Sequence, residues 1–469
     1  MGSIAIVWLR ADLRVHDHPA LSAAAAAHDH VVPLFVVDER LTSGGRFPSG
    51  PRNAFLRGCL AGLDASLRTL GAGLVVREGR PEDVVPRLAL EVGAAEVLWT
   101  SAVSPFARRR DRAVTDALRT AGIAVSPQPG GYCADVSVPR TKAGKPLTGF
   151  TPFWRAQGEL PRREVLEPPR RLSLPDGLDP GELPAGPSLA DELPEPFCAP
   201  GEAAARAAAD AWLDGPVDRY AERHDELSGG TSGLSAYLRW GCVSPRELEQ
   251  RAMDRGGGGA AAFVRQLAWR DFYAHVLLHF PGNARLEFQP RYRDLEWADD
   301  PELLEAWTSG RTGYPLVDAG MRQLAATGWM HNRARMVVGS FLTKDLHLDW
   351  RAGEAWFQRT LLDGEPAQNN GNWQWVASTG VDPAPYFRRM FNPVLQQRKF
   401  DPDGAYVRRW VPELRGVGDE RLAEPWTMSE AEQAAAGCVI GRDYPGPVVD
   451  HAQERQVAMT RYRAAAGAS

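Results

Sequence analysis

Residues 4–18 read IAIVWLRADLRVHDH, a short apolar run followed by a charged turn. A strand that is buried on both faces reads as a continuous apolar run of this kind. Similar runs follow at residues 31–37, 74–76, 97–99 and 123–125, and the stretches between them have helical spacing. This alternation predicts an α/β domain built on a doubly wound parallel sheet.

The helix after the second run shows the spacing clearly. Phe55, Cys59, Leu63 and Leu67 recur along one helical face, and Gly71 follows as a favourable stop. The turn at the end of the first strand lacks the GxGxxG pattern of a dinucleotide-binding domain. We therefore expect a Rossmann-like sheet that offers a ligand crevice at its strand ends, but not an ordinary NAD site.

Composition narrows the class of protein. At 469 residues the chain favours two domains and allows three, and its 44% hydrophobic and 24% charged shares are those of a soluble globular protein. No apolar run is long enough to span a membrane. The net charge of −5 argues against an indiscriminate nucleic-acid coat but allows a local basic face. Five scattered cysteines and the lack of a secretory signal predict a cytoplasmic protein with reduced thiols.

Composition also changes along the chain. Ten prolines fall between residues 161 and 200, which is typical of an extended linker. Beyond it helical patterns dominate, and 12 of the 15 tryptophans lie there. We divide the chain into an α/β domain at 1–130, a linker at 131–203 and an all-α domain at 204–469. The glycine run at 256–259 is expected to be a loop between two helices.

Residues 361–375, LLDGEPAQNNGNWQW, carry an unusual mixture of side chains. Asp363 and Glu365 accept hydrogen bonds, Asn369 both donates and accepts, and Gly371 allows close backbone approach. This mixture is typical of the wall of a cofactor pocket. A helix-connecting turn with two core tryptophans is the alternative that these residues alone leave open.

Two further segments allow a functional and a structural interpretation. GTSGLS at 230–235 precedes a helical stretch and suits either a phosphate cradle or a plain helix cap. Gln266, Trp269 and Tyr273 share one helical face, which suits a stacked, base-sized ligand. On spacing alone, however, an amphipathic core helix is the favoured interpretation of that face.

Basic residues gather late in the chain. The segment WMHNRARM at 329–336 provides two arginines, one suited to a buried acid and one to a phosphate. Aromatic and basic residues interleave from 387 to 409, as at a nucleic-acid backbone contact or on an exposed charged surface. The paired histidines lack third and fourth ligands, so we expect no metal site.

Six motifs stand out along the chain: WLRADLRVHDHPAL, GTSGLSAYLRWGCVSP, QLAWRDFY, TGYPLVDAGMRQL, GWMHNRARM and DGEPAQNNGNWQWVASTG. In this order they resemble the photolyase/cryptochrome family and most closely class I cyclobutane pyrimidine dimer (CPD) photolyases. The resemblance runs from Ile4 to about Tyr462. It implies an α/β antenna domain, a long linker and a helical domain that holds a U-shaped FAD.

The resemblance assigns cofactor contacts to matching positions. Asn369 matches the residue that faces flavin N5, where an uncharged amide tolerates the anionic reduced FAD that repair requires. Plant-type cryptochromes carry aspartate there, so Asn369 favours an enzyme over a photoreceptor. The positions implied to bind FAD are Tyr220, Thr231, Ser232, Gly233, Leu234, Ser235, Arg270, Arg335, Asp363, Gly364, Glu365 and Asn369.

The resemblance also implies an electron path and a substrate. Trp373, Trp350 and Trp297 match the family's electron-transfer triad, whereas Trp375 and Asn370 are interpreted as structural. The substrate is UV-damaged DNA, whose pyrimidine dimer is flipped out of the duplex before light-driven cleavage by this carbon–carbon lyase. The positions implied to contact the lesion or the strand are Arg223, Gln266, Trp269, Asn332, Arg333, Met336, Arg388 and Gln396.

Two departures from the class I pattern bear on function. Gln266 stands where class I enzymes have glutamate, and there is an extra residue beside Arg388, so either Arg388 or Arg389 meets phosphate. Glutamine at 266 is similar to (6-4) photolyases, but the histidines those enzymes carry are replaced by Asn332 and Met336. The alternatives are therefore a cryptochrome-like blue-light receptor without repair activity, or (6-4) repair.

The second chromophore and the assembly complete the expectations. Folate-binding relatives have glutamate where this chain has Ala107, so the resemblance favours 8-hydroxy-5-deazaflavin over folate as an antenna. The protein is expected to be a monomer that does not associate with membranes.

Overall fold

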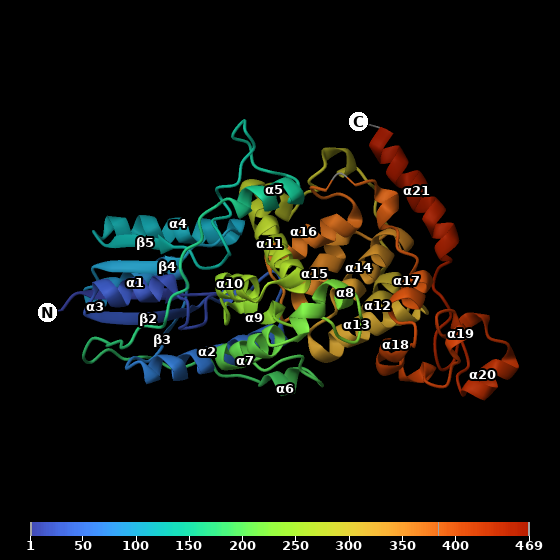
Figure 1. The fold of residues 1–469 in the computed structure, drawn as a ribbon, viewed down its shortest axis with the longest axis horizontal. Helices are drawn as coiled ribbons and strands as arrows, with labels where there is room; N and C mark the ends of the chain where they lie inside the picture. Colours follow the sequence, from blue (N-terminus) through green and yellow to red (C-terminus); the bar gives the residue numbers. More distant parts are fainter. Residues whose placement is uncertain (1, 383, 468–469) are drawn as a thin grey trace.

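The computed structural model describes residues 2–382 and 384–467, and it places a sheet domain at one end of the long axis (Figure 1). The described residues form one sheet of five parallel strands in the order β3-β2-β1-β4-β5. The doubly wound sheet expected from the sequence is confirmed. Its strands are β1 (Ile4–Leu9), β2 (His30–Val37), β3 (Val75–Glu78), β4 (Glu96–Thr100) and β5 (Ala124–Gln128).

The helices that cover the sheet are α1 (Pro19–Ala27), α2 (Gly50–Thr69), α3 (Pro81–Val92) and α4 (Pro105–Thr120). Side chains of β1 alternate between two helical layers. Ala5, Val7 and Leu9 pack with α1 and α2, whereas Ile6 and Trp8 pack with α3 and α4. Because both faces are covered, the strand is apolar at nearly every position.

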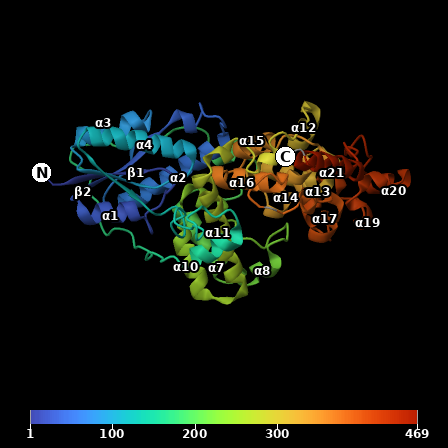
Figure 2. The same cartoon turned by 90° about the horizontal axis from the view of Figure 1, so that it is seen from above.

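The helical region has no strand among the described residues, as expected. Both views show α19 and α20 at the far end of the long axis from the sheet (Figures 1 and 2). Its helices are α7 (Glu202–Leu213), α8 (Tyr220–Arg223), α9 (Ser235–Trp240), α10 (Pro245–Arg255), α11 (Gly257–His279), α12 (Pro301–Thr308), α13 (Pro315–Thr327), α14 (Asn332–Ser340), α15 (Trp350–Thr360), α16 (Pro366–Ala377), α17 (Pro393–Phe400), α18 (Ala405–Trp410), α19 (Asp419–Leu422), α20 (Glu430–Ala436) and α21 (His451–Gly467).

Shorter turns link these helices. A π-helical turn lies at Phe341–Asp345, directly after α14. The 3₁₀ turns are Glu39–Leu41, Pro216–Arg219, Pro281–Ala284, Pro290–Tyr292, Tyr386–Arg389, Pro412–Leu414 and Pro425–Thr427.

The two glycine predictions have different outcomes. Gly71 follows α2 with a φ of 100°, which confirms it as the helix stop. The loop predicted at 256–259 is wrong, because α10 ends at Arg255 and α11 begins at Gly257. A Cβ on Gly259 would lie 2.1 Å from the Val217 carbonyl oxygen, so the glycines let the start of α11 press against that backbone.

The segment between the sheet and the helical region is mostly irregular, with α5 (Phe150–Gly158) and α6 (Leu189–Glu192) inside it. The ring of Phe150 stacks on Trp269 of α11, with centroids 3.8 Å apart and planes 6° apart. A plain surface linker does not require such a contact. The domain boundaries at residues 130 and 203 stay predictions.

The loop after β1 joins the sheet to the helical region. The backbone N–H of Val15 donates to Glu202 at 2.8 Å, and the Arg14 guanidinium donates to the Gly241 carbonyl at 3.0 Å. The apolar core under α1 and α2 also continues into α7, α9 and α11. One core therefore fixes the strand ends against the helices that carry the site.

Candidate functional site

The turn between α15 and α16 carries the two acids noted in the sequence. Asp363 is buried, and its carboxylate accepts hydrogen bonds from the Arg335 guanidinium at 2.7 and 3.1 Å. Glu365 caps α16 by accepting from the backbone N–H of Gln368 at 2.9 Å, and Pro366 takes the first helical position. Proline is favoured at the first helical position, so the local helix start fixes Glu365, whereas Asp363 is fixed by Arg335 from α14.

Three donors hold the carbonyls of this turn. Trp240 Nε1 donates to the Leu362 oxygen at 3.2 Å, while Arg239 Nε and Gln358 Nε2 each donate to the Gly364 oxygen at 2.9 Å. These donors come from α9 and α15. Buried carbonyls that are all bound leave the turn little freedom, so the acids keep one orientation.

The two asparagines of α16 have different surroundings. Asn369 is buried, and its Nδ2 donates to the Glu354 carbonyl at 2.9 Å and to Gln358 Oε1 at 3.1 Å. Asn370 donates to the Glu354 carboxylate at 3.0 Å and accepts from Asn283 at 3.2 Å. Asn370 is thus fully engaged inside the protein, which confirms its interpretation as structural.

The polar segment at 231–235 leads into α9. Ser235 is exposed and its hydroxyl accepts from Trp329 Nε1 at 3.2 Å, and Trp329 in turn stacks on Phe197 with centroids 4.1 Å apart. Sequence reasoning gave Trp329 no role, although it lies inside a quoted motif. Tyr220, at the start of α8, is half-buried. The half-buried positions before α9 are Thr231, Ser232 and Gly233, and the buried one is Leu234.

The three tryptophans of the predicted electron path run from the interior outward. Trp373 and Trp350 are 3% and 0% exposed, and Trp297 is half-buried. A Cβ on Gly353 would lie 2.1 Å from Trp373 Cη2, so the Trp373 indole packs on α15 one turn from Trp350. Within the described part of the chain, the buried Trp373 Nε1 has no hydrogen-bond partner.

The residues predicted to meet DNA divide into free and engaged groups. Gln266, Asn332 and Arg388 are exposed. Arg333 instead pairs with Asp225 at 2.7 Å. The remaining residues predicted to meet DNA are Arg223, which pairs with Glu226 at 2.6 Å, and the half-buried Trp269, Met336 and Gln396.

The two adjacent arginines of the 3₁₀ turn Tyr386–Arg389 differ sharply in burial and in their contacts. Arg389 is 3% exposed, pairs with Asp382 and donates to the Trp375 carbonyl at 2.9 Å. Arg388 is exposed, and its side chain makes no hydrogen bond within the described residues. Of the two, Arg388 is therefore the one free to meet a phosphate.

A cavity of about 290 Å³ lies between α5, α11 and α16. Trp269, Tyr273 and Trp375 line it together with Arg265. Trp375, interpreted from sequence as packing, does pack under the Arg389 guanidinium at 4.1 Å, and it also forms part of this wall.

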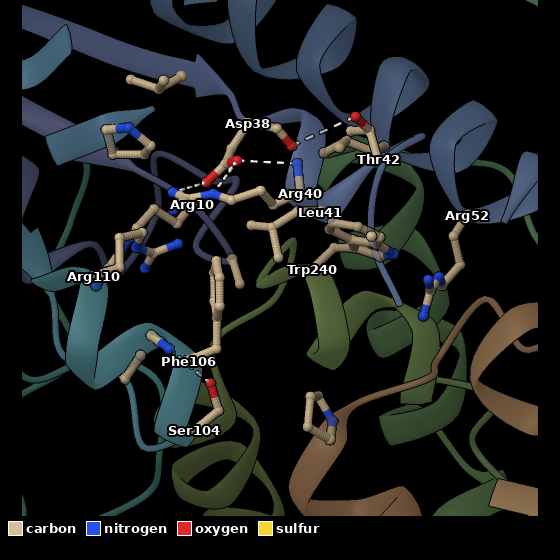
Figure 3. Close-up of a pocket in the computed structure, with 18 of the residues that line it drawn as sticks. Arg10, Asp38, Arg40, Leu41, Thr42, Arg52, Ser104, Phe106, Arg110 and Trp240 are labelled. Carbon is tan, nitrogen blue, oxygen red and sulfur yellow. Dashed lines mark hydrogen bonds and ion pairs between the residues drawn. The ribbon is translucent and has the colours of Figure 1, made fainter. Parts of the chain in front are cut away.

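A larger pocket of about 880 Å³ lies at the carboxyl ends of the strands and reaches the turn at Glu365 (Figure 3). Arg239 and Arg270, the latter predicted to bind the cofactor, both line it. Burial, with the nearby Arg239 charge, lowers the pKa of Arg52 to about 10. Among the described residues neither Arg52 nor Arg239 has a carboxylate partner, so this end of the pocket suits an anionic or strongly polarised ligand.

The described residues contain neither a cluster of metal ligands nor a helix that could span a membrane. No three histidine, cysteine or acidic side chains converge as metal ligands. No helix combines the length and the apolar character that a bilayer span requires.

Comparison with known proteins supplies the family. Residues 5–170 match the model of DNA photolyase, and residues 263–464 match the model of the FAD binding domain of DNA photolyase. The deoxyribodipyrimidine photo-lyase of Streptomyces griseus is 44% identical to this chain, and the match covers 97% of the chain and 98% of that relative. The chain belongs to the DNA photolyase family.

Solved structures of photolyase relatives agree in fold along the whole chain. A bacterial class III photolyase from Agrobacterium tumefaciens superposes with a TM-score of 0.90 at 36% identity, covering 99% of this photolyase-family chain and 98% of that one. A cryptochrome from Synechocystis reaches 0.89 at 31% identity, covering 98% and 99%. The fold is thus shared by repair enzymes and a cryptochrome, so function depends on the site.

Proposed function

We propose that this protein is a light-dependent deoxyribodipyrimidine photo-lyase that splits cyclobutane pyrimidine dimers in UV-damaged DNA with FAD as cofactor. The observation that carries the proposal is the near full-length identity of 44% with a relative of that name. An uncharged amide at Asn369 supports an enzyme over a plant-type photoreceptor. Positions 332 and 336, where (6-4) photolyases carry histidine, hold asparagine and methionine here, which weighs against (6-4) repair.

The residues present fit FAD. Asn369 Oδ1 receives no hydrogen bond within the described chain, and Trp373 Nε1 is buried without an acceptor. The hydroxyl and backbone N–H groups that lead into α9 suit phosphates, while the fixed acids suit hydroxyl or amine donors. The residues that would hold FAD are Tyr220, Thr231, Ser232, Gly233, Leu234, Ser235, Arg335, Asp363, Gly364, Glu365 and Asn369, with Arg270 beside them.

When bound in its reduced, anionic form, FAD supplies on light absorption the electron that opens the cyclobutane ring, and it takes that electron back afterwards. The protein contributes position and environment rather than a nucleophile. Arg335 orients Asp363 through two hydrogen bonds, and the bound carbonyls of the turn hold the segment that carries both acids. Asn369 offers an acceptor without adding a negative charge near the reduced cofactor.

The lesion face combines a polar edge with stacking surfaces. Gln266 and Asn332 are exposed and suit the hydrogen-bonding edge of a flipped pyrimidine, and Trp269 supplies an aromatic wall beside them. Met336 and Arg333 border this face, with Arg333 oriented by Asp225. Arg223, Arg388 and Gln396 would meet the strand that flanks the lesion.

The tryptophan path has a separate task. Trp373, Trp350 and Trp297 would carry electrons from the surface toward oxidised FAD and so restore the active form. Trp373 and Trp350 are buried and Trp297 is half-buried, which supports Trp297 as the outer end of the path.

The 880 Å³ pocket is the proposed antenna site, and 8-hydroxy-5-deazaflavin is its proposed occupant. Ala107 lies in the pocket wall where folate-binding relatives have glutamate, which makes folate the weaker candidate. Extraction of chromophores from protein made in its native host tests this, and recovery of folate would contradict it.

We also propose that the protein acts as a cytoplasmic monomer. Its five cysteines are free thiols, which suits a reducing compartment. The sheet and the helices share one core within a single chain, so a second copy is not needed to bury it. Gel filtration of the holoprotein at several concentrations tests the monomer.

The repair assay tests the main proposal. Holoprotein with reduced FAD is illuminated with DNA that carries cyclobutane dimers, beside a dark control and a (6-4) lesion. We expect intact pyrimidines from the first lesion only, and only in light. Absence of repair in light would leave a cryptochrome-like receptor as the better interpretation, and repair of the second lesion alone would move the substrate to (6-4) photoproducts.

A further inference from the structure

The side-chain amide of Asn369 is held by a chain of hydrogen bonds that begins and ends at backbone carbonyls. Gln358 Nε2 donates to the Gly364 carbonyl at 2.9 Å. Gln358 Oε1 then accepts from Asn369 Nδ2 at 3.1 Å, and the Glu354 carbonyl accepts from the same nitrogen at 2.9 Å.

This chain has only one workable orientation. Backbone carbonyls accept and never donate, so the nitrogen of Gln358 must face Gly364 and its oxygen must face Asn369. The nitrogen of Asn369 must then face both Gln358 and Glu354. Both amide hydrogens are used, and Oδ1 is the atom left for a ligand.

We propose that Gln358 is a positioning residue that fixes Asn369 with its oxygen toward the flavin N5 position. This rests on the proposed function, which puts N5 opposite Asn369. An acceptor there binds a protonated N5 and repels the lone pair of an unprotonated one. The site therefore favours reduced FAD over oxidised FAD before any light is absorbed.

The plain alternative is that Gln358 only ties down the turn at Gly364. It is 7% exposed and borders the large pocket, so it also fills space. The two roles differ in one measurable property. A tie for the turn affects folding and FAD content, whereas an orienting residue also shifts the redox equilibrium of bound FAD.

Gln358→Met keeps the approximate volume and removes both the donor and the acceptor. Asn369 then keeps only its bond to Glu354 and can turn its second N–H toward an unprotonated N5. We expect the ratio of reduced to oxidised FAD at a fixed potential to fall about tenfold, which is about 30 mV for a two-electron couple. The measurement is a spectroscopic redox titration of the holoprotein.

Thr360→Val is the matched control on the same helix. The Thr360 hydroxyl bonds only to the Trp356 carbonyl of α15, at 2.8 Å, so we expect an unchanged potential. Gln358→Glu provides the rescue. Its protonated carboxyl can donate to Gly364 and accept from Asn369, so at low pH we expect the potential that the wild type has at the same pH.

An unchanged potential in Gln358→Met with FAD bound, or an equal shift in Thr360→Val, would overturn the proposal. If Gln358→Met does not bind FAD, Gln358→Asn decides, because its shorter amide cannot bridge Gly364 and Asn369, and an unchanged potential there overturns the proposal as well. The potential needs no DNA. A protein that shows the shift but repairs no dimer would therefore retain Gln358 as a positioning residue while the photo-lyase function fails.

Discussion

Replacement of Trp373 by phenylalanine separates the entry of electrons from the repair reaction. The indole is 3% exposed and packs edge-on to Phe357 at 5.0 Å and to Trp307 at 6.1 Å. Its Nε1 has no partner within the described residues, so its loss leaves no buried acceptor unpaired. The cost is therefore packing alone. We expect about 1–2 kcal/mol, below the roughly 3–5 kcal/mol of truncation of a tryptophan to alanine.

The functional effect is expected to be selective. Trp373→Phe should photoreduce oxidised FAD no faster than free FAD under the same light and reductant, because phenylalanine does not give up an electron as indole does. Chemically reduced Trp373→Phe should repair dimers like the wild type, because the repair electron does not pass through this position. Flavin absorbance under illumination and a repair assay in anaerobic buffer measure the two activities.

Trp307→Phe is the matched control. Trp307 is fully buried and lies beside Trp373, but its Nε1 donates to the Val338 carbonyl at 2.9 Å. Its replacement should cost roughly 1 kcal/mol more than that of Trp373, because a hydrogen bond is also lost. Photoreduction should nevertheless persist. If Trp307→Phe blocks photoreduction and Trp373→Phe does not, electrons reach the flavin by another route and the reasoning fails.

Four other substitutions test the lesion face, the basic segment and the buried acid. Gln266 is exposed, so Gln266→Glu should change the free energy of unfolding by less than about 0.5 kcal/mol. It should raise the rate of dimer repair by the reduced enzyme, and an unchanged rate would remove Gln266 from the lesion contacts. Arg388→Ala should weaken DNA binding and lower its salt dependence by about one charge. Arg389→Ala should instead lower the free energy of unfolding by roughly 1–3 kcal/mol, and the reverse result would exchange the roles of the two arginines. Burial raises the pKa of Asp271 to about 7, so the folded protein holds a proton that the unfolded chain loses near pH 4. The free energy of unfolding should therefore fall between about pH 4 and pH 7, by up to about 1.4 kcal/mol per pH unit, and denaturant titrations of Asp271→Asn should lack this slope.

Features that depend on local sequence were predictable. The apolar runs indicated the strands because a strand that is buried on both faces has apolar side chains at consecutive positions. The acids at Asp363 and Glu365 were visible because one short segment contains them with its own helix start. The sequence suggested that one arginine of the segment 329–336 meets a buried acid, and the structure pairs Arg335 with Asp363.

Features that depend on long-range contact were not predictable. The glycines from residue 256 onward suggested a loop, yet α11 begins at Gly257, and Gly259 lacks a side chain because the backbone at Val217 packs against it. Phe150 lies in a segment predicted to be a linker, and only the fold shows that it stacks on Trp269. Arg388 and Arg389 are adjacent residues of the same type, so the sequence does not distinguish them, and only their different burial in the structure does.

Helix α16 explains why one short stretch serves both the cofactor and the electron path. Glu365 caps the helix, Asn369 follows four residues later and Trp373 four residues after that. At 1.5 Å per residue these side chains span about 12 Å, and the 3.6-residue period keeps them along one side of the helix. The cap thus sets the direction of the whole series, and Gly353 admits the indole at its far end. If Asn369 and Trp373 have the proposed roles, a change at the cap would shift both side chains together, and redox preference and photoreduction would change together.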